Sequence, residues 1–178
     1  MKFTQLYDFI TENSAQREYS CLMLDLSFIK PEFEQFQKEI CPCDVYDAEP
    51  GHGIEHEPHI TILYGLHVQQ LKPIKNKIEF CPVKFKIKDI SLFENKDFDV
   101  LKFGIESKDL YDLNQQVVNN FEHSNKYPEY KPHSTIAYLM PGSGHYYKKM
   151  KNELVGKSFE TNKFIFSNKY GDKVFFTV

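Results

Sequence analysis

The 178-residue sequence contains no tryptophan, a single arginine (Arg17) among its 22 basic residues, and no excess of positive charge. A net charge of −3 argues against a protein that binds long nucleic acid through a basic surface. No apolar run approaches the roughly 20 residues that a membrane span needs, and residues 1–20 are too polar for a signal peptide. We therefore expect a cytoplasmic protein without a membrane partner. A small anionic ligand is compatible with this composition, because local charge can outweigh the net value.

The four cysteines include no Cys-x-x-Cys pair, the spacing typical of structural zinc sites. Cys41 and Cys43 flank Pro42, and two cysteines this close are rarely bridged. In a cytoplasmic chain we expect these two, with Cys21 and Cys81, to be reduced thiols. The cysteines therefore predict no metal centre.

Apolar spacing predicts helices that interleave with strands along residues 1–178, which we interpret as a single bilobal domain. The expected helices cover residues 3–14, 31–40, 68–79, 108–124 and 144–156. The expected strands cover residues 19–27, 59–66, 83–95, 99–107 and 133–140, followed by a hairpin of 157–168 and 172–178. Because hairpins are frequent, the fold class is α+β with a largely antiparallel sheet.

One seven-residue pattern, Pro-His-x-Thr-Ile-x-Tyr, occurs at residues 58–64 and again at residues 132–138. A strand needs alternating apolar residues, but nothing in sheet packing requires His and Thr at the same two offsets twice. Surface or core polar residues would explain either copy alone. The repetition favours a functional site built from both copies.

Each motif strand should present its histidine and threonine on one face, because side chains alternate along an extended strand. The isoleucines and the tyrosines, Tyr64 and Tyr138, should then lie on the opposite face, in the core. The side chains predicted to form the site are His59, Thr61, His133 and Thr135.

Two imidazoles that face one site suit acid–base catalysis near neutral pH, because free histidine titrates at about 6.5. A neutral ring takes a proton from an attacking hydroxyl or water, and a charged ring gives a proton to the leaving oxygen. Two threonine hydroxyls can donate hydrogen bonds to the non-bridging oxygens of a phosphate. These groups predict cleavage of a phosphodiester without a metal or another cofactor. The sequence does not indicate which histidine acts first as the base.

The paired His-x-Thr motifs resemble those of the 2H phosphoesterase superfamily. This resemblance implies a bilobal fold with two mainly antiparallel sheets, helices outside, pseudo-two-fold symmetry and an active-site groove between the lobes. It also implies metal-independent cleavage of 2′,3′-cyclic phosphates or related diesters. By the same resemblance, His59 and His133 are the acid–base pair, and Thr61 and Thr135 hold the phosphate.

A narrower resemblance, carried by "EPHITILYGLH", "YSCLMLDLS" and "FSNKYGDKVFFTV", is to the phage anti-CBASS protein 1 branch. It implies a phosphodiesterase that degrades cyclic di- and trinucleotide messengers in the cytoplasm of an infected bacterium. Tyr19, Phe93 and Glu160 stand at the positions that hold the bases in that branch. Phe93 departs from the tryptophan of the branch pattern, and all three residues also fit a purely structural role.

Two further groups of charged residues have simpler explanations. His52 and His56 precede His59, but the metalloprotease signature His-Glu-x-x-His is absent, and Pro58 prevents the helix that it needs. We expect His52 and His56 on a loop at the mouth of the site. The lysines at 84, 86 and 88 share one face of a strand, which favours a charged edge strand over a field that attracts an anionic ligand.

The predicted partner is therefore a small cyclic oligonucleotide, and the oligomeric state is left open. One alternative is a 2H enzyme that acts on RNA 2′,3′-cyclic phosphates or on 2′–5′ oligoadenylate, for which a basic track would be expected. The other alternative is a nucleotide-binding sponge without catalysis, and the intact histidines and threonines argue against it.

Overall fold

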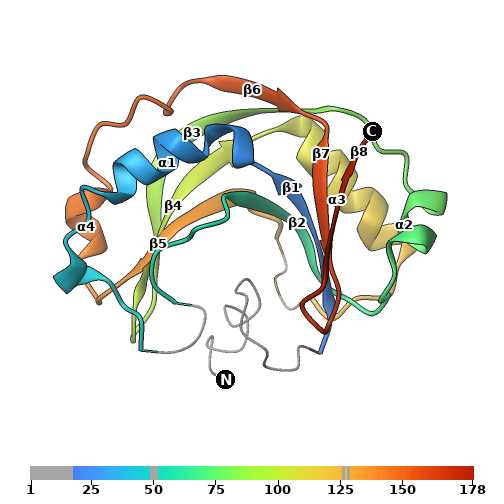
Figure 1. Cartoon of the computed structure of the whole chain (residues 1–178), viewed down its shortest axis with the longest axis horizontal. Coiled ribbons are helices and arrows are strands. Elements are labelled where there is room, and N and C mark those ends of the chain that lie inside the picture. The colour runs from blue at the N-terminus through green and yellow to red at the C-terminus, as the bar shows by residue number, and fades with distance from the viewer. Residues whose placement is uncertain (1–17, 49–51, 126, 128) are drawn as a thin grey trace.

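Two four-stranded antiparallel sheets form an arch in the computed structural model, which describes residues 18–48, 52–125, 127 and 129–178 (Figure 1). The first sheet has the order β2 (His59–Leu66), β1 (Ser20–Asp25), β7 (Lys163–Ser167) and β8 (Lys173–Thr177). The second sheet has the order β5 (His133–Leu139), β4 (Asp99–Glu106), β3 (Val83–Glu94) and β6 (Ser158–Thr161). The predicted α+β class with antiparallel sheets is confirmed.

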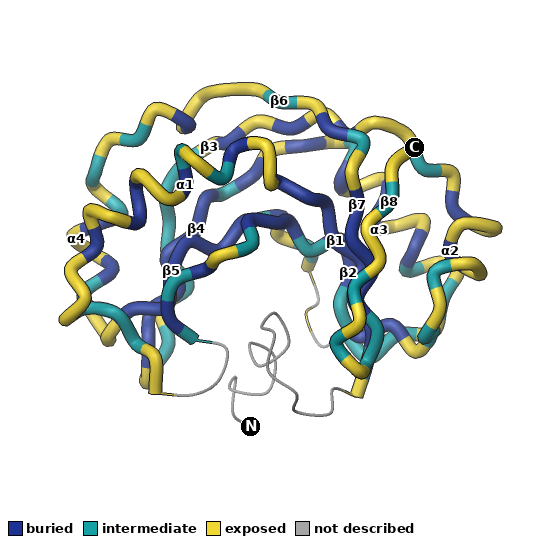
Figure 2. The backbone as a smooth tube through the Cα atoms, in the orientation of Figure 1, coloured by how far each residue is buried: buried dark blue, intermediate teal, exposed yellow. Residues whose placement is uncertain are grey.

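The main hydrophobic core lies on the outer side of the arch, between the sheets and the helices that cover them (Figure 2). The helices are α1 (Lys30–Gln37), α2 (Leu71–Lys77), α3 (Lys108–Asn120) and α4 (Gly144–Tyr147), with short 3-10 turns at Ser27–Ile29 and Pro42–Asp44. Phe33 and Phe36 of α1 are buried in this core, as are Leu110 and Val117 of α3. Each such side chain stabilises the fold by roughly 1.5–3 kcal/mol.

A strand–helix–strand unit occurs twice, as β1–α1–β2 and as β4–α3–β5. In both units the motif strand pairs antiparallel with the first strand of the unit. Both motif strands are also the inner edges of their sheets, so β2 and β5 meet at the centre of the arch (Figure 1). The topology therefore joins the two copies of the repeated pattern with pseudo-two-fold symmetry.

Three elements differ from their predictions. The sequence predicts one strand over 157–168, but that segment is split at Asn162 into β6 and β7, which belong to different sheets. The predicted helix over 144–156 ends at Tyr147, and the Asn152 side chain accepts a bond from the Leu154 amide at 2.8 Å that stabilises a local turn instead. The helix expected over 68–79 is shorter, since α2 covers Leu71–Lys77, and Pro73 is tolerated in its first turn.

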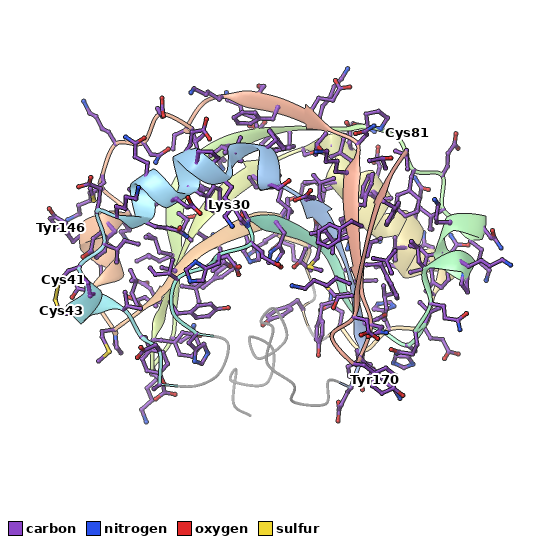
Figure 3. All side chains as sticks on the ribbon, in the orientation of Figure 1. Lys30, Cys41, Cys43, Cys81, Tyr146 and Tyr170 are labelled. Atoms are coloured by element: carbon purple, nitrogen blue, oxygen red, sulfur yellow. A yellow bond between two sulfur atoms is a disulfide. The ribbon has the colours of Figure 1, made fainter. Side chains whose placement is uncertain are left out.

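The expectation of reduced thiols is wrong for Cys41 and Cys43, which form a disulfide (Figure 3). The 3-10 turn at Pro42–Asp44 brings their Cα atoms to 5.2 Å, within the range for a disulfide. Cys21 and Cys81 are in the thiol form, as predicted.

The predicted edge strand is also wrong, because β3 pairs with β4 on one side and with β6 on the other. Its lysines Lys84, Lys86 and Lys88 are exposed, and Lys84 forms an ion pair with Glu160 of β6 at 3.8 Å. The helix expected over residues 3–14 lies outside the described residues. In the part of the chain that is described, no helix is long and apolar enough to cross a membrane.

Candidate active site

The two motif histidines are held in the same way on adjacent strands. The Nδ1 atom of His59 lies 2.6 Å from the Glu57 carbonyl oxygen, and Nδ1 of His133 lies 2.7 Å from the Lys131 carbonyl oxygen. A carbonyl accepts only, so Nδ1 carries the proton in both rings. In the neutral form each ring therefore keeps Nε2 as a free base, which is the arrangement that proton transfer needs.

Each histidine shares its strand face with the threonine of its motif. Across β1, Asp25 pairs with His59 and Met23 with Thr61, while across β4, Gly104 pairs with His133 and Lys102 with Thr135. Cross-strand partners lie on the same face. We call this the inner face, because it lines the inner side of the arch, opposite the main core. Neither threonine hydroxyl forms a hydrogen bond with another described residue, so both can donate to a ligand.

A β-bulge follows the threonine in both motif strands. The register shifts by one residue after Thr61, leaving Ile62 unpaired, and by one residue after Thr135, leaving Ile136 unpaired. The extra residue reverses the alternation beyond it. Tyr64 and Tyr138 therefore lie on the inner face and not in the main core, and the prediction for both tyrosines is wrong.

The backbone carbonyl of each bulge residue accepts a hydrogen bond from a buried amide side chain on the helix of the other strand–helix–strand unit. Asn114 Nδ2 of α3 donates to the Ile62 oxygen at 2.7 Å, and Gln37 Nε2 of α1 donates to the Ile136 oxygen at 2.9 Å. Gln37 also donates to the Glu55 carbonyl at 2.7 Å. These bonds satisfy carbonyls that the bulge removes from regular pairing and hold each motif strand in register.

The surroundings of His133 favour its neutral form. Burial, and to a lesser extent the positive charges of Lys102 and His59, lower the pKa of His133 to about 4, although the bond to the Lys131 carbonyl opposes them. The ring of Phe93 meets the His133 ring edge-on, with centroids 4.9 Å apart. At neutral pH His133 is therefore an uncharged base.

Carboxylates lie beside the other histidine. Asp25 is the cross-strand neighbour of His59, and the charge of His59 also acts on Glu55, where it opposes the burial that raises the pKa of the Glu55 carboxyl. Glu57, two residues before His59, forms an ion pair with Lys173 of β8. Acidic residues therefore neighbour His59, whereas the charge of Lys102 acts on His133.

Two of the three predicted base-contacting residues border the inner face. Phe93 packs with Val100 and Tyr138 beside His133, while Tyr19 packs with Tyr64 and Met23 in the first sheet. Each sheet thus carries a small aromatic and apolar cluster next to its His–Thr pair. The Tyr19 ring also stacks on His67, with centroids 5.2 Å apart.

The structure does not bring Glu160 to the histidines. Its carboxylate lies 3.8 Å from Lys84 Nζ, at the opposite end of β3 from Phe93. Its strand β6 runs along the top of the arch, whereas β5 lines the inner side (Figure 1).

The histidines that precede the first motif strand do not form a metal site in the described part of the chain. His52 lies among the rings of Tyr46, Phe98 and Tyr138, at centroid distances of 4.8–5.1 Å, and His56 is exposed. Among the described residues, the only three potential ligands within 4.8 Å of one another belong to Cys41, Cys43 and Asp44, and two of these are the disulfide.

Four residues near the site lie outside the repeated motif and were not predicted, although the sequence contains features that could have indicated them. Asp25 is the only charged residue of "SCLMLD", at its end, and Lys102 is the only charged residue of "DVLKFGIE" between its two terminal residues. Gln37 and Asn114 are single amides on apolar helix stripes, and both are buried. A buried polar residue needs a hydrogen-bonding partner, so each of these positions indicated a specific polar contact in the folded chain.

Comparisons with known proteins identify the fold. No protein-family model and no curated protein matches the sequence. Among solved structures, Usb1 from Kluyveromyces marxianus has 8% identity and a TM-score of 0.54, over 92% of this chain and 99% of that one.

Two structures of E. coli LigT also match. The complex with 3′-AMP has 13% identity and a TM-score of 0.57, over 90% of this chain and 94% of that one. The complex with phosphate has 12% identity and a TM-score of 0.55, over 92% and 96%. The chain therefore has the fold of LigT and Usb1, and this LigT-like fold is the one that the resemblance of the paired motifs implied.

Proposed function

We propose that the chain is a metal-independent phosphodiesterase that opens cyclic di- and trinucleotide messengers, such as 3′,3′-cGAMP and cyclic tri-adenylate. The observation that carries the chemistry is the matched presentation of His59 and His133, each with Nδ1 bonded to a carbonyl and each beside a free threonine hydroxyl. The substrate class rests on the resemblance to the phage anti-CBASS branch. In that role the enzyme would block bacterial CBASS defence.

The first step is attack of a ribose 2′-hydroxyl on the neighbouring 3′–5′ phosphodiester. Nε2 of His133, neutral at pH 7, takes the hydroxyl proton as the new bond to phosphorus forms. His59, beside Asp25 and Glu55, gives a proton to the departing 5′ oxygen. The hydroxyls of Thr61 and Thr135 donate to the non-bridging oxygens, where negative charge grows. The products are a free 5′-hydroxyl and a 2′,3′-cyclic phosphate.

The second step is hydrolysis of the 2′,3′-cyclic phosphate with the histidine roles exchanged. His59, now neutral, takes a proton from the attacking water. His133, now protonated, returns its proton to the departing 2′ oxygen. The product is a 3′-phosphate, and both rings regain their starting protonation states.

The clusters around Tyr19 and Phe93 are suited to contact the bases on either side of the reacting phosphate. Stacking of a base on an aromatic side chain contributes about 1–3 kcal/mol. One cluster stands in each sheet, which fits a ligand with two bases and an approximate two-fold axis.

A second candidate function is hydrolysis of RNA ends that carry a 2′,3′-cyclic phosphate, or of 2′–5′ oligoadenylate. It is favoured by the fold shared with LigT, which has been crystallised with 3′-AMP. Hydrolysis of an RNA 2′,3′-cyclic phosphate would use the second step alone, and in 2′–5′ oligoadenylate the 3′-hydroxyl would attack in place of the 2′-hydroxyl, with the same histidines and threonines acting.

Turnover by chelator-treated protein, followed by chromatography with mass detection, tests these functions. The substrates are 3′,3′-cGAMP, cyclic tri-adenylate and an RNA that ends in a 2′,3′-cyclic phosphate. We expect linear products with 3′- or 2′,3′-cyclic phosphate from the rings, and none with His133→Ala. Turnover of the RNA alone would support the second function. Tight binding of the rings without any product would support a sponge and overturn the proposal.

A further inference from the structure

Lys102 lies on the inner face beside Thr135. The equivalent position beside Thr61, in the first sheet, carries no charge. Lys102 is the cross-strand partner of Thr135, and the matching partner of Thr61 is Met23. Both side chains are buried, Lys102 at 8% exposure and Met23 at 6%. The two units thus place an ammonium beside one threonine and a thioether beside the other.

The contacts of Lys102 include no ion pair, although the Asp89 carboxylate acts on its charge. Its Nζ donates to the Ser91 hydroxyl at 2.9 Å and lies 4.2 Å from the centre of the Phe93 ring. None of the described carboxylates lies within ion-pair distance of it. Burial disfavours the ammonium more strongly than the Asp89 charge favours it, so a negatively charged ligand beside Lys102 would stabilise its charged form.

We propose that Lys102 is a catalytic residue that binds a non-bridging phosphoryl oxygen beside Thr135 and keeps His133 the first base. This inference rests on the proposed function and adds a charged group to the paired motifs. An ammonium at this point stabilises the charge that develops on the phosphoryl oxygens. Its proximity also penalises a proton on His133 until the substrate phosphate arrives and offsets the repulsion.

The charged groups that act on this pair come from three sides. Asp89 of β3 acts on Lys102 and raises its pKa, although burial has the larger, opposite effect. Lys131, which precedes β5, lowers the pKa of Lys102, and His59 of β2 lowers that of His133. Lys131 is exposed and paired with Glu129 at 3.2 Å. Lys102, in contrast, is buried and is the cross-strand partner of Thr135.

The test replaces Lys102 by the residue that its counterpart carries. Lys102→Met should lower kcat by roughly 10²-fold on whichever diester the protein turns over, and should weaken binding of inorganic phosphate about tenfold. It should also raise the pKa of His133, measured by NMR titration of the imidazole signal. Lys102→Arg should recover most of the loss, and Lys86→Met, which removes an exposed lysine from β3, should change nothing.

These readouts separate the inference from the proposed function. If no diester is turned over but Lys102→Met still weakens phosphate binding and raises the His133 pKa, the function is overturned and the role of Lys102 is supported. Should Lys102→Met fail to fold, Lys102→Gln keeps a polar side chain without charge and should reproduce both effects. Unchanged phosphate binding and an unchanged His133 pKa in a folded variant would overturn the inference, whatever the activity.

Discussion

The two strand–helix–strand units repeat the scaffold of the site but not its charges. In both, a histidine bonds the carbonyl two residues before it, and a bulge follows the threonine. In both, a helix amide bonds the bulge carbonyl. Around the first histidine, however, the acidic residues Asp25 and Glu55 are neighbours, with burial raising the pKa of the Glu55 carboxyl, and the ammonium of Lys102 acts on the second.

This difference gives the two histidines separate roles. Acid–base catalysis of one bond cleavage needs one protonated and one neutral ring at the same pH, and two identical environments would not supply them. Pairs of titratable groups with environments of opposite sign are the usual solution. The symmetric backbone positions two imidazoles, and in the proposed mechanism the unmatched residues around His133 favour its neutral form.

Removal of either histidine should have the largest effect. His59→Ala and His133→Ala should each lower kcat by about 10²–10⁴-fold, the typical contribution of a general acid or base. Chelator-treated turnover of the best substrate measures this. His145→Ala is the matched control, because His145 is half-exposed and pairs with Glu94 on a different part of the second sheet. A histidine variant with wild-type kcat would exclude that ring from proton transfer.

Loss of the threonine hydroxyls should distinguish the two units. Thr61→Val should lower kcat by roughly 10²-fold, as for removal of one donor to a developing charge. Thr135→Val should cost only about tenfold, because Lys102 still acts on the same phosphoryl oxygen. The double variant Lys102→Met with Thr135→Val lacks both groups, so its loss of kcat should be larger than that of Thr135→Val alone. Equal losses for the two single variants would show that the units hold the phosphate alike.

The two helix amides should matter for both stability and rate. Gln37→Leu and Asn114→Leu each leave a bulge carbonyl without its side-chain donor, which should cost about 1–3 kcal/mol of unfolding free energy. We expect kcat to fall about tenfold, because His and Thr lie on the strand that shifts. Denaturant unfolding and turnover measure the two effects.

Exposed amides on the same helices provide the controls. Asn120 bonds only the Gln116 carbonyl of its own helix, and Gln35 of α1 is exposed. Alanine at either position should leave the unfolding free energy within about 0.5 kcal/mol of wild type. A loss as large as that of Gln37→Leu would point to the helices themselves rather than to the bulges.

The sequence predicted the site more completely than its surroundings. Alternation along a strand placed His59 and Thr61 together, since that rule depends on neighbours two residues apart. The same rule failed at Tyr64, because a bulge is a tertiary feature that local pattern does not reveal. The change of sheet at Asn162 was likewise hidden, since both parts of the segment are ordinary strand sequence.

Some of the missed features were nonetheless repeated in the sequence. "FEQFQKEI" from Phe33 and "LYDLNQQV" from Leu110 both carry apolar residues at the first, fourth and eighth positions and an amide at the fifth. The amides are Gln37 and Asn114. Their purpose could not be inferred before the bulges were known, because a buried amide identifies a need for partners but not which carbonyls they are.

The pH dependence of the rate should reveal which histidine is the base. Since His133 must be neutral to act and its pKa lies at about 4, its base form persists from pH 7 down to about pH 5. The base limb of kcat/KM should therefore fall by less than about twofold over this range, against roughly thirtyfold for a base with the ordinary pKa of about 6.5. If kcat/KM instead falls with an apparent pKa near 6.5, and Lys102→Met does not change that pKa, the base would be His59.

The smallest effect is expected at Glu160, the predicted base contact that stands apart from both units. Its carboxylate pairs with Lys84, and both side chains are at least half-exposed, so the pair contributes only about 0–1 kcal/mol to stability. Since β6 runs along the top of the arch, Glu160→Gln should change KM by less than about twofold. Phe93→Ala, in contact with the His133 ring, should raise KM more than tenfold if a base stacks there. A KM raised by Glu160→Gln as strongly as by Phe93→Ala would mean that the ligand reaches β6, and that recognition extends well beyond the two aromatic clusters.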